Sequence, residues 1–155
     1  MAYYTTYNSP IGKIFIVENN GFISTVSFCD NTIKNIPQKI TPLLNNVCSQ
    51  LEEYFCHKRT SFNIPILPQG TPFQQSIWKE LLNIPYGKTQ TYLEIASKLY
   101  SPKYCRAVGF ANNKNPIAII VPCHRVIGSN GKLIGYAGGT HIKQFLLNLE
   151  RNFNA

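Results

Sequence analysis

The stretch IAIIVPCHR, residues 117–125, places a cysteine and a histidine side by side directly after an apolar run. The run from Ile117 to Val121 predicts a buried strand. Cys123 and His124 would then lie at its end, in a loop of the kind that often presents reacting groups. Thiols react as thiolates, and a neighbouring imidazole helps one to form near neutral pH. The stretch therefore predicts a reactive thiol at Cys123.

After the cysteine, the chain predicts a hairpin and a final helix. Residues 126–136 are expected to form a hairpin around Asn130-Gly131, the pair most typical of a two-residue type I′ turn. The glycine-rich segment 135–139 allows close approach of backbone. In the helix of residues 141–152, Glu150 lies at the edge of the inward stripe, where it would be partly buried. That stripe comprises Ile142, Phe145, Leu146 and Leu149.

Three helices are predicted before the cysteine, and the last two are joined closely enough to form a helix-turn-helix. The first begins at Thr71 and is broken by residues 85–87. The second, residues 91–100, opens with a capping-box pattern completed by Glu94. The third, residues 101–112, begins with a serine and a proline, which favour the start of a helix.

The third of these helices has two different faces. Its inward stripe comprises Tyr104, Val108 and Ala111. On the other side lie Lys103, Arg106 and Phe110, about one turn apart. Such a face is typical of a helix that docks on DNA, but a solvated charged face with Phe110 folded back onto the core fits the pattern equally well.

The N-terminal third predicts a small lobe with an antiparallel sheet. Strand-forming runs at residues 3–7, 13–18 and 22–28 are separated by turn signals, which indicates a three-stranded meander. A helix is expected from Thr41, with a proline at its first position. Residues 60–70 read as a last strand and a linker.

Charge and hydropathy limit the classes of function. The chain has 155 residues, enough for one domain or two small lobes, and 15 Lys and Arg against 7 Asp and Glu give a formal charge of +8. Such an excess attracts polyanions such as nucleic acid, although solubility alone also explains it. No apolar window is long enough for a membrane span and the N-terminus does not resemble a signal peptide, so a cytoplasmic location is expected.

The cysteine pattern argues against disulfides and metal. The five cysteines are odd in number and contain no CxxC pair, so neither a disulfide framework nor a compact zinc site is expected. We therefore predict no bound metal and treat the four cysteines other than Cys123 as inert.

Taken together, these pieces resemble the O6-alkylguanine-DNA alkyltransferases. The match rests on residues 115–126, 128–131 and 135–139, with further similarity at 71–74, 84–89 and 106–109. The resemblance implies an α/β (α+β) protein with two lobes. Residues 1–68 would form a ribonuclease-H-like α/β lobe with an antiparallel sheet and a helix. Residues 69–155 would form a mostly helical, winged-helix-like DNA-binding domain that carries the acceptor.

The resemblance also implies an activity that needs no cofactor. Cys123 would accept the alkyl group of O6-alkylguanine, or of O4-alkylthymine, irreversibly and once per protein molecule. His124 would activate the thiol through a water, and Glu150 would orient His124. The partner would be double-stranded DNA carrying the alkylated base, bound by a monomer, with cooperative binding left open.

Further roles follow from the same resemblance, in which the target base is flipped out of a duplex that is bound through its minor groove. Arg106 would fill the gap that the flipped base leaves, and Asn115 would tie the helix-turn-helix to the active-site loop. The residues implied in DNA or base contact are Tyr92, Ser101, Arg106, Ala107, Asn115, Val126, Ser129 and Ala137.

Two other functions compete with this one. A relative that binds alkylated bases without repairing them would lack the acceptor, and Cys123 argues against it. A hydrolase would use Cys123 and His124 as a dyad. Adjacent residues of a strand point in different directions, so direct contact within such a dyad is awkward, and a hydrolase leaves the basic helix-turn-helix unexplained.

Overall fold

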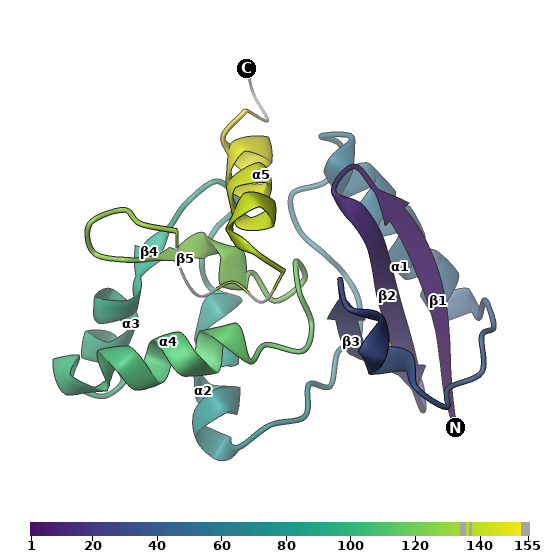
Figure 1. Cartoon of the computed structure of the whole chain (residues 1–155), viewed down its shortest axis with the longest axis horizontal. Coiled ribbons are helices and arrows are strands. Elements are labelled where there is room, and N and C mark those ends of the chain that lie inside the picture. The colour runs from purple at the N-terminus through teal and green to yellow at the C-terminus, as the bar shows by residue number, and fades with distance from the viewer. Residues whose placement is uncertain (134–135, 137, 153–155) are drawn as a thin grey trace. The chain divides into compact units, whose positions relative to one another are not determined.

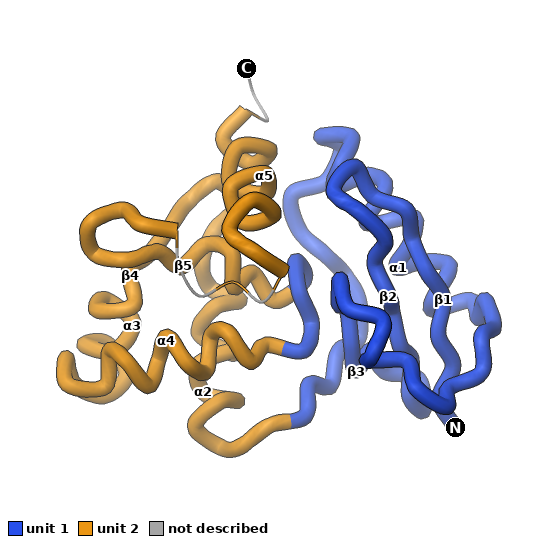
Figure 2. Tube along the Cα trace, in the orientation of Figure 1, with its two compact units in different colours: residues 1–69, 116–120 blue, residues 70–115, 121–155 orange. Residues whose placement is uncertain are grey.

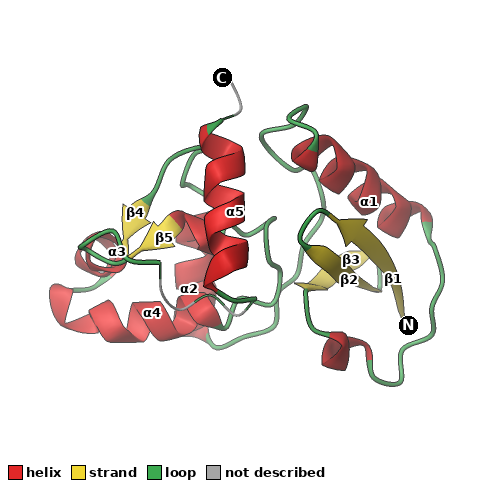
Figure 3. Ribbon diagram, turned by 45° about the horizontal axis from the view of Figure 1, so that its top comes forward, coloured by secondary structure: helices red, strands yellow, loops and turns green. Residues whose placement is uncertain are grey.

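The computed structural model describes residues 1–133, 136 and 138–152, and its helices and strands are labelled in Figure 1. The chain divides into two compact units, coloured separately in Figure 2. Unit 1 comprises residues 1–69 and 116–120, and unit 2 comprises residues 70–115 and 121–155. Unit 1 contains a three-stranded sheet, whereas unit 2 is mostly helical, which confirms the predicted mixed class (Figure 3).

Unit 1 is the predicted antiparallel meander with one long helix against it. The strands β1 (Ala2–Ser9), β2 (Gly12–Asn19) and β3 (Phe22–Ser27) pair in chain order, and the short 3₁₀ helix η1 (Asp30–Ile33) follows. Helix α1 (Pro42–Phe55) starts where expected, because the Thr41 hydroxyl accepts a hydrogen bond from the Leu44 amide at 3.1 Å. The fully buried core residues are Ile14, Ile16, Ile23, Leu44, Val47, Leu51, Tyr54 and Ile117.

The strand predicted over Ile117 to Val121 is wrong. Ile117 forms only an isolated parallel bridge with Val26, bracketed by hydrogen bonds of Val26 with Pro116 and Ala118. The backbone then turns, and Ile119 adopts a φ of +72°, a conformation that β-branched residues rarely take. Prolines at 116 and 122 supply no N–H at either end of the run, so a strand ladder cannot extend. The run is largely buried, as predicted, but its backbone forms a turn and not a strand.

The described residues of unit 2 contain four α-helices, which begin at or near the predicted positions. They are α2 (Pro72–Leu81), α3 (Tyr92–Leu99), α4 (Cys105–Asn113) and α5 (Thr140–Arg151). Thr71 with Gln74 and Thr91 with Glu94 form complete capping boxes, which fix the starts of α2 and α3. Buried apolar side chains from all four helices form the core, among them Ile77, Leu81, Ile95, Val108 and Leu146.

The helix-turn-helix is present, with a different entry into its second helix. Residues from Ser101 first form the 3₁₀ helix η2 (Pro102–Tyr104), and α4 follows. Tyr104 is therefore 39% exposed, and the prediction that it points inward is wrong. The Trp78 indole donates to the Ala111 carbonyl at 2.9 Å, which fixes α4 against α2.

The segment after the cysteine only partly matches the expected hairpin. β5 (Val126–Ile127) pairs in parallel with β4 (Gln90–Thr91). The Gly131 amide donates to the Gly128 carbonyl, and the Gly128 amide donates to the Lys132 carbonyl. Gly131 has a φ of +80°, but Asn130 is not left-handed, so the turn is a three-residue one and not type I′. Much of the expected second arm lies outside the described residues.

We predict that Thr91→Ala destabilises the chain by about 1 kcal/mol, because the first turn of α3 loses the hydroxyl that caps it. Thr91→Ser, which retains the hydroxyl, should stay close to the parent. Urea denaturation of the three proteins measures the difference. Equal losses in both variants would show that the methyl group, and not the cap, holds this helix start.

Candidate active site

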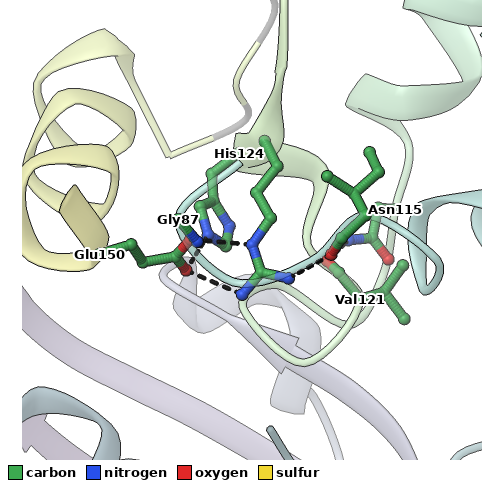
Figure 4. Close-up of polar contacts among 7 residues, drawn as sticks. Gly87, Asn115, Val121, His124 and Glu150 are labelled. Carbon is green, nitrogen blue, oxygen red and sulfur yellow. Dashed lines mark hydrogen bonds and ion pairs between the residues drawn. The ribbon is translucent and has the colours of Figure 1, made fainter. Parts of the chain in front are cut away.

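The cysteine is presented by a single 3₁₀ turn, η3 (Cys123–Arg125), whose three side chains are all buried. Two asparagines hold the backbone around it. The Asn112 amide group donates to the Cys123 carbonyl at 3.2 Å. The Asn115 amide group donates to the Val121 carbonyl at 2.9 Å, as Figure 4 shows. The backbone around the cysteine is therefore held by side chains at and just after the C-terminal end of α4.

The centre of the site is the buried carboxylate of Glu150 on α5 (Figure 4). His124 Nε2 lies 2.7 Å from its Oε2. Arg125 binds both oxygens, with Nε 2.8 Å from Oε1 and a terminal nitrogen 3.0 Å from Oε2. The Gly87 amide donates to Oε1 at 3.2 Å, and the other Arg125 nitrogen donates to the Ile84 carbonyl at 2.7 Å. One carboxylate thus joins α5, η3 and the turn after α2.

These contacts fix the charge states of the pair. Burial alone would raise the pKa of Glu150, but the hydrogen bonds and charges of His124 and Arg125 outweigh burial and hold that pKa well below its usual range. Burial lowers the pKa of His124 despite the neighbouring carboxylate. His124 is therefore neutral near pH 7. With Nε2–H donated to Glu150, its Nδ1 carries the lone pair.

The thiol of Cys123 is 6% exposed, and burial raises its pKa. A hydrogen bond from Asn115 and the charge of Lys143 act in the opposite direction. Lys143 is fully buried and donates to the Tyr92 hydroxyl at 3.3 Å. Burial also lowers the pKa of Lys143 to about 8. At rest Cys123 is thus a protonated thiol, beside a cation that can stabilise its thiolate.

A direct Cys–His dyad is not formed. His124 Nε2 is taken by Glu150, and no described residue hydrogen-bonds its buried Nδ1. A base that does not touch the thiol can still remove its proton through an intervening water. The geometry is therefore unlike that of a cysteine hydrolase, in which nucleophile and base lie within hydrogen-bonding reach.

The structure brings together some of the other predicted residues and leaves others on the surface. Tyr92 is buried at the start of α3, next to Lys143, and Val126 is buried in β5. Arg106 and Ala107 are exposed on α4.

Two further predicted residues are engaged in local turns, and one is not described. Ser101 caps η2 by accepting from the Lys103 amide at 3.3 Å. Ser129 is exposed in the turn after β5. Ala137 lies outside the described residues.

Four residues of the site were missed from the sequence: Gly87, Asn112, Arg125 and Lys143. Arg125 is adjacent to His124, but a buried arginine is unexpected until its carboxylate partner is known. For Lys143 a signal exists, since it shares one helical stripe with Leu146, Leu147 and Glu150. Gly87 and Asn112 act through long-range hydrogen bonds that no spacing reveals.

Two features typical of other functional classes are absent from the described residues. Within the described ranges, no three His, Cys, Asp or Glu side chains are grouped so as to hold a metal ion. None of the helices in this part of the chain has the length and apolar character that crossing a membrane requires. All five cysteines are free thiols, and Cys123 alone among them is buried.

Two family models match the chain one after the other. Residues 2–68 match the ribonuclease-like domain of 6-O-methylguanine DNA methyltransferase. Residues 72–152 match the DNA-binding domain of the same protein. The second match contains the helix-turn-helix and every described residue of the site.

Similar proteins cover nearly the whole chain. The constitutive methylated-DNA–protein-cysteine methyltransferase of Bacillus subtilis is 47% identical over 159 residues, covering 97% of this chain and 96% of the relative. The methylated-DNA–protein-cysteine methyltransferase of Methanosarcina acetivorans is 49% identical over 152 residues, covering 96% and 97%.

Solved structures agree with the sequence matches. The O6-methylguanine methyltransferase of Mycobacterium tuberculosis has a TM-score of 0.93 at 40% identity, covering 100% of this chain and 96% of that chain. M. tuberculosis OGT in complex with DNA has a TM-score of 0.90 at 42% identity, covering 97% and 94%. The fold is that of a DNA-binding protein, and its site contains a buried thiol. The chain belongs to the O6-methylguanine-DNA methyltransferase family.

Acid should destabilise this protein through the buried cluster. The pKa of Glu150 is depressed on folding, so its contribution is present above about pH 4.3, the ordinary value for Glu, and is lost as the pH falls through the folded-state pKa. The depressed pKa of His124 acts in the same direction below about pH 6.5. We predict that the urea midpoint starts to fall below about pH 6.5, where His124 is protonated in the unfolded state, and falls further below about pH 4.3, where Glu150 is.

Glu150→Gln leaves Arg125 buried without its counter-charge, and we expect it to cost about 3–5 kcal/mol near pH 7. It should also weaken the acid dependence below about pH 4.3, where the parent's carboxylate titrates in the unfolded state. Glu53→Gln is the matched control, because its ion pair with Arg59 is partly exposed, and it should keep the parent's dependence. An unaltered acid dependence of Glu150→Gln below about pH 4.3 would disprove the depressed pKa assigned to Glu150.

Proposed function

We propose that Cys123 is the residue that accepts the alkyl group when this family member repairs O6-alkylguanine in double-stranded DNA. One arrangement carries the proposal. The thiol of Cys123 is buried, and Asn112 and Asn115 hold the backbone on either side of it. The next residue, His124, is neutral and is held in place by Glu150. O4-alkylthymine is the second substrate that we propose, because it presents the same kind of alkylated oxygen on a base.

The chemistry is a displacement at the alkyl carbon. The Cys123 sulfur forms the new C–S bond, the bond from that carbon to O6 breaks, and the released electron pair stays on the guanine, which takes up a proton. The thiol proton passes through a water to Nδ1 of His124, and Glu150 stabilises the imidazolium that forms. Lys143 stabilises the thiolate. The thioether product has no easy hydrolysis, so each molecule reacts once.

The target carbon is stacked within a duplex and must be flipped out to reach a buried sulfur. We assign to Arg106, exposed on α4, the role of filling the space that the base leaves. Ala107 beside it allows close approach of the DNA backbone. Tyr92 and Val126 lie at the base pocket, and Ser101 and Ser129 at phosphates; Ala137 keeps the base contact that the sequence implied.

The remaining parts of the proposal concern organisation. Residues 69–155 act as the DNA-binding and acceptor domain, and residues 1–68 as the separate N-terminal lobe. The protein acts as a monomer in the cytoplasm on chromosomal DNA. No metal or organic cofactor takes part in the displacement, because a thiolate and an alkylated base are sufficient reactants.

We predict that labelled O6-methylguanine duplex transfers one equivalent of methyl per protein onto the peptide that contains Cys123. Cys123→Ala should accept none, since the nucleophile is gone. Cys105→Ala, in the same unit, should react like the parent. Peptide mapping by mass spectrometry reads out the label. Several turnovers per molecule, or label on the Cys123→Ala protein, would refute the assignment and favour a hydrolase or a binding protein.

We further predict that Arg106→Ala slows repair in duplex DNA by at least about tenfold, whereas reaction with free O6-benzylguanine, which needs no flipping, keeps its rate. Lys58→Ala, a basic residue of unit 1, controls for the loss of one positive charge. Single-turnover rates on both substrates measure the effect. An equal loss on both would rule out the flipping role.

A further inference from the structure

Phe110 is an unexplained side chain on the helix that carries Arg106. It is 63% exposed and does not fold back onto the core. Within the described part of unit 2, no other large apolar side chain is as exposed. Because it follows Arg106 by four residues in α4, the two side chains share one face of the helix. The alkyl-transfer chemistry gives this ring no role.

The ring borders a hollow in the surface of unit 2. The hollow has a volume of about 680 Å³ and lies between the start of α2 and the helices η2 and α4. Phe73, Ala107 and Ala111 supply much of its apolar wall, and Lys103 and Arg106 supply positive charge. A third cation, Lys114, places its Nζ 5.2 Å from the centre of the Phe110 ring. Cations thus lie in and beside an apolar hollow.

This combination fits one class of partner. A DNA strand alternates apolar deoxyribose rings with anionic phosphates, and a hollow with an apolar wall and positive surroundings is complementary to both. An apolar peptide would gain nothing from the cations, and a free phosphate would gain nothing from the ring. Apolar side chains such as Phe enter minor grooves and wedge between base steps in proteins that bind DNA there. The net charge of +8 favours the same partner.

We propose that Phe110 is a DNA-docking residue that packs its ring against the sugar wall of the bound duplex, one helical turn from Arg106. The inference rests on the proposed function, because it takes duplex DNA as the substrate, and it adds an apolar contact to an otherwise electrostatic interface. Phe110 touches no reacting atom. It positions the duplex so that Arg106 reaches the base stack.

The test separates apolar from ionic contributions through their salt dependence. Binding of an unmodified fluorescent duplex is measured for the parent, Phe110→Ala, Phe110→Leu and Lys103→Ala at several salt concentrations. Phe110→Ala should bind on the order of tenfold more weakly with an unchanged slope of log K against log salt, because no counterion is released by an apolar contact. Phe110→Leu should recover most of the affinity. Lys103→Ala should lower the slope by about 1.

Two further readouts exclude a merely structural effect. Phe110→Ala should keep the parent's thermal midpoint and its reaction rate with free O6-benzylguanine. Parent-like DNA binding by Phe110→Ala, or an equal loss on the free base, would overturn this inference while leaving the proposed function intact. A parent protein that binds no duplex at all would overturn both.

Discussion

The structure of unit 2 depends on one buried carboxylate. Glu150 accepts from His124, Arg125 and the Gly87 amide, so three segments far apart in sequence share a single negative charge. Such a charge is costly to bury unless it is fully paired, and here the bidentate guanidinium supplies the counter-charge. Because Arg125 neutralises the carboxylate, the hydrogen bond from His124 can fix the tautomer of a neutral imidazole. The same carboxylate therefore stabilises unit 2 and sets the protonation state of His124.

The protonation state of the Cys123 thiol has a different physical cause. Burial holds the pKa of Cys123 up, while Lys143 and the Asn115 hydrogen bond oppose it. A thiol kept protonated and covered is a poor target for oxidants and for chance electrophiles, which matters for a protein that can react only once. Reaction then requires an electrophile held in place together with a route for the proton. Selectivity thus arises from the resting state of the sulfur as well as from the fit of the base.

The parts of this molecule that sequence predicts are those set by local chemistry. Thr41, Thr71 and Thr91 begin their helices because a hydroxyl beside a free amide needs no distant partner. The run from Ile117 to Val121 was misjudged because hydrophobicity predicts burial but not backbone path, and the flanking prolines prevent a ladder. Arg125 and Gly87 could not be found, because their roles exist only once α5 brings Glu150 between them. The site was identified by resemblance, and its electrostatics only by structure.

The surface of α4 would affect both how tightly the protein binds DNA and how freely it slides along it. A purely ionic interface holds DNA strongly at low salt but lets the protein slide, since phosphates recur along every sequence. An apolar contact such as the one proposed for Phe110 is weakened little by salt. Its contribution to affinity depends on how well the ring fits into the groove. Distorted duplex around a damaged pair is easier to deform than regular duplex. A rigid ring one turn from Arg106 would therefore favour the distorted site over its neighbours, which gives a repair protein a physical means of pausing where damage lies.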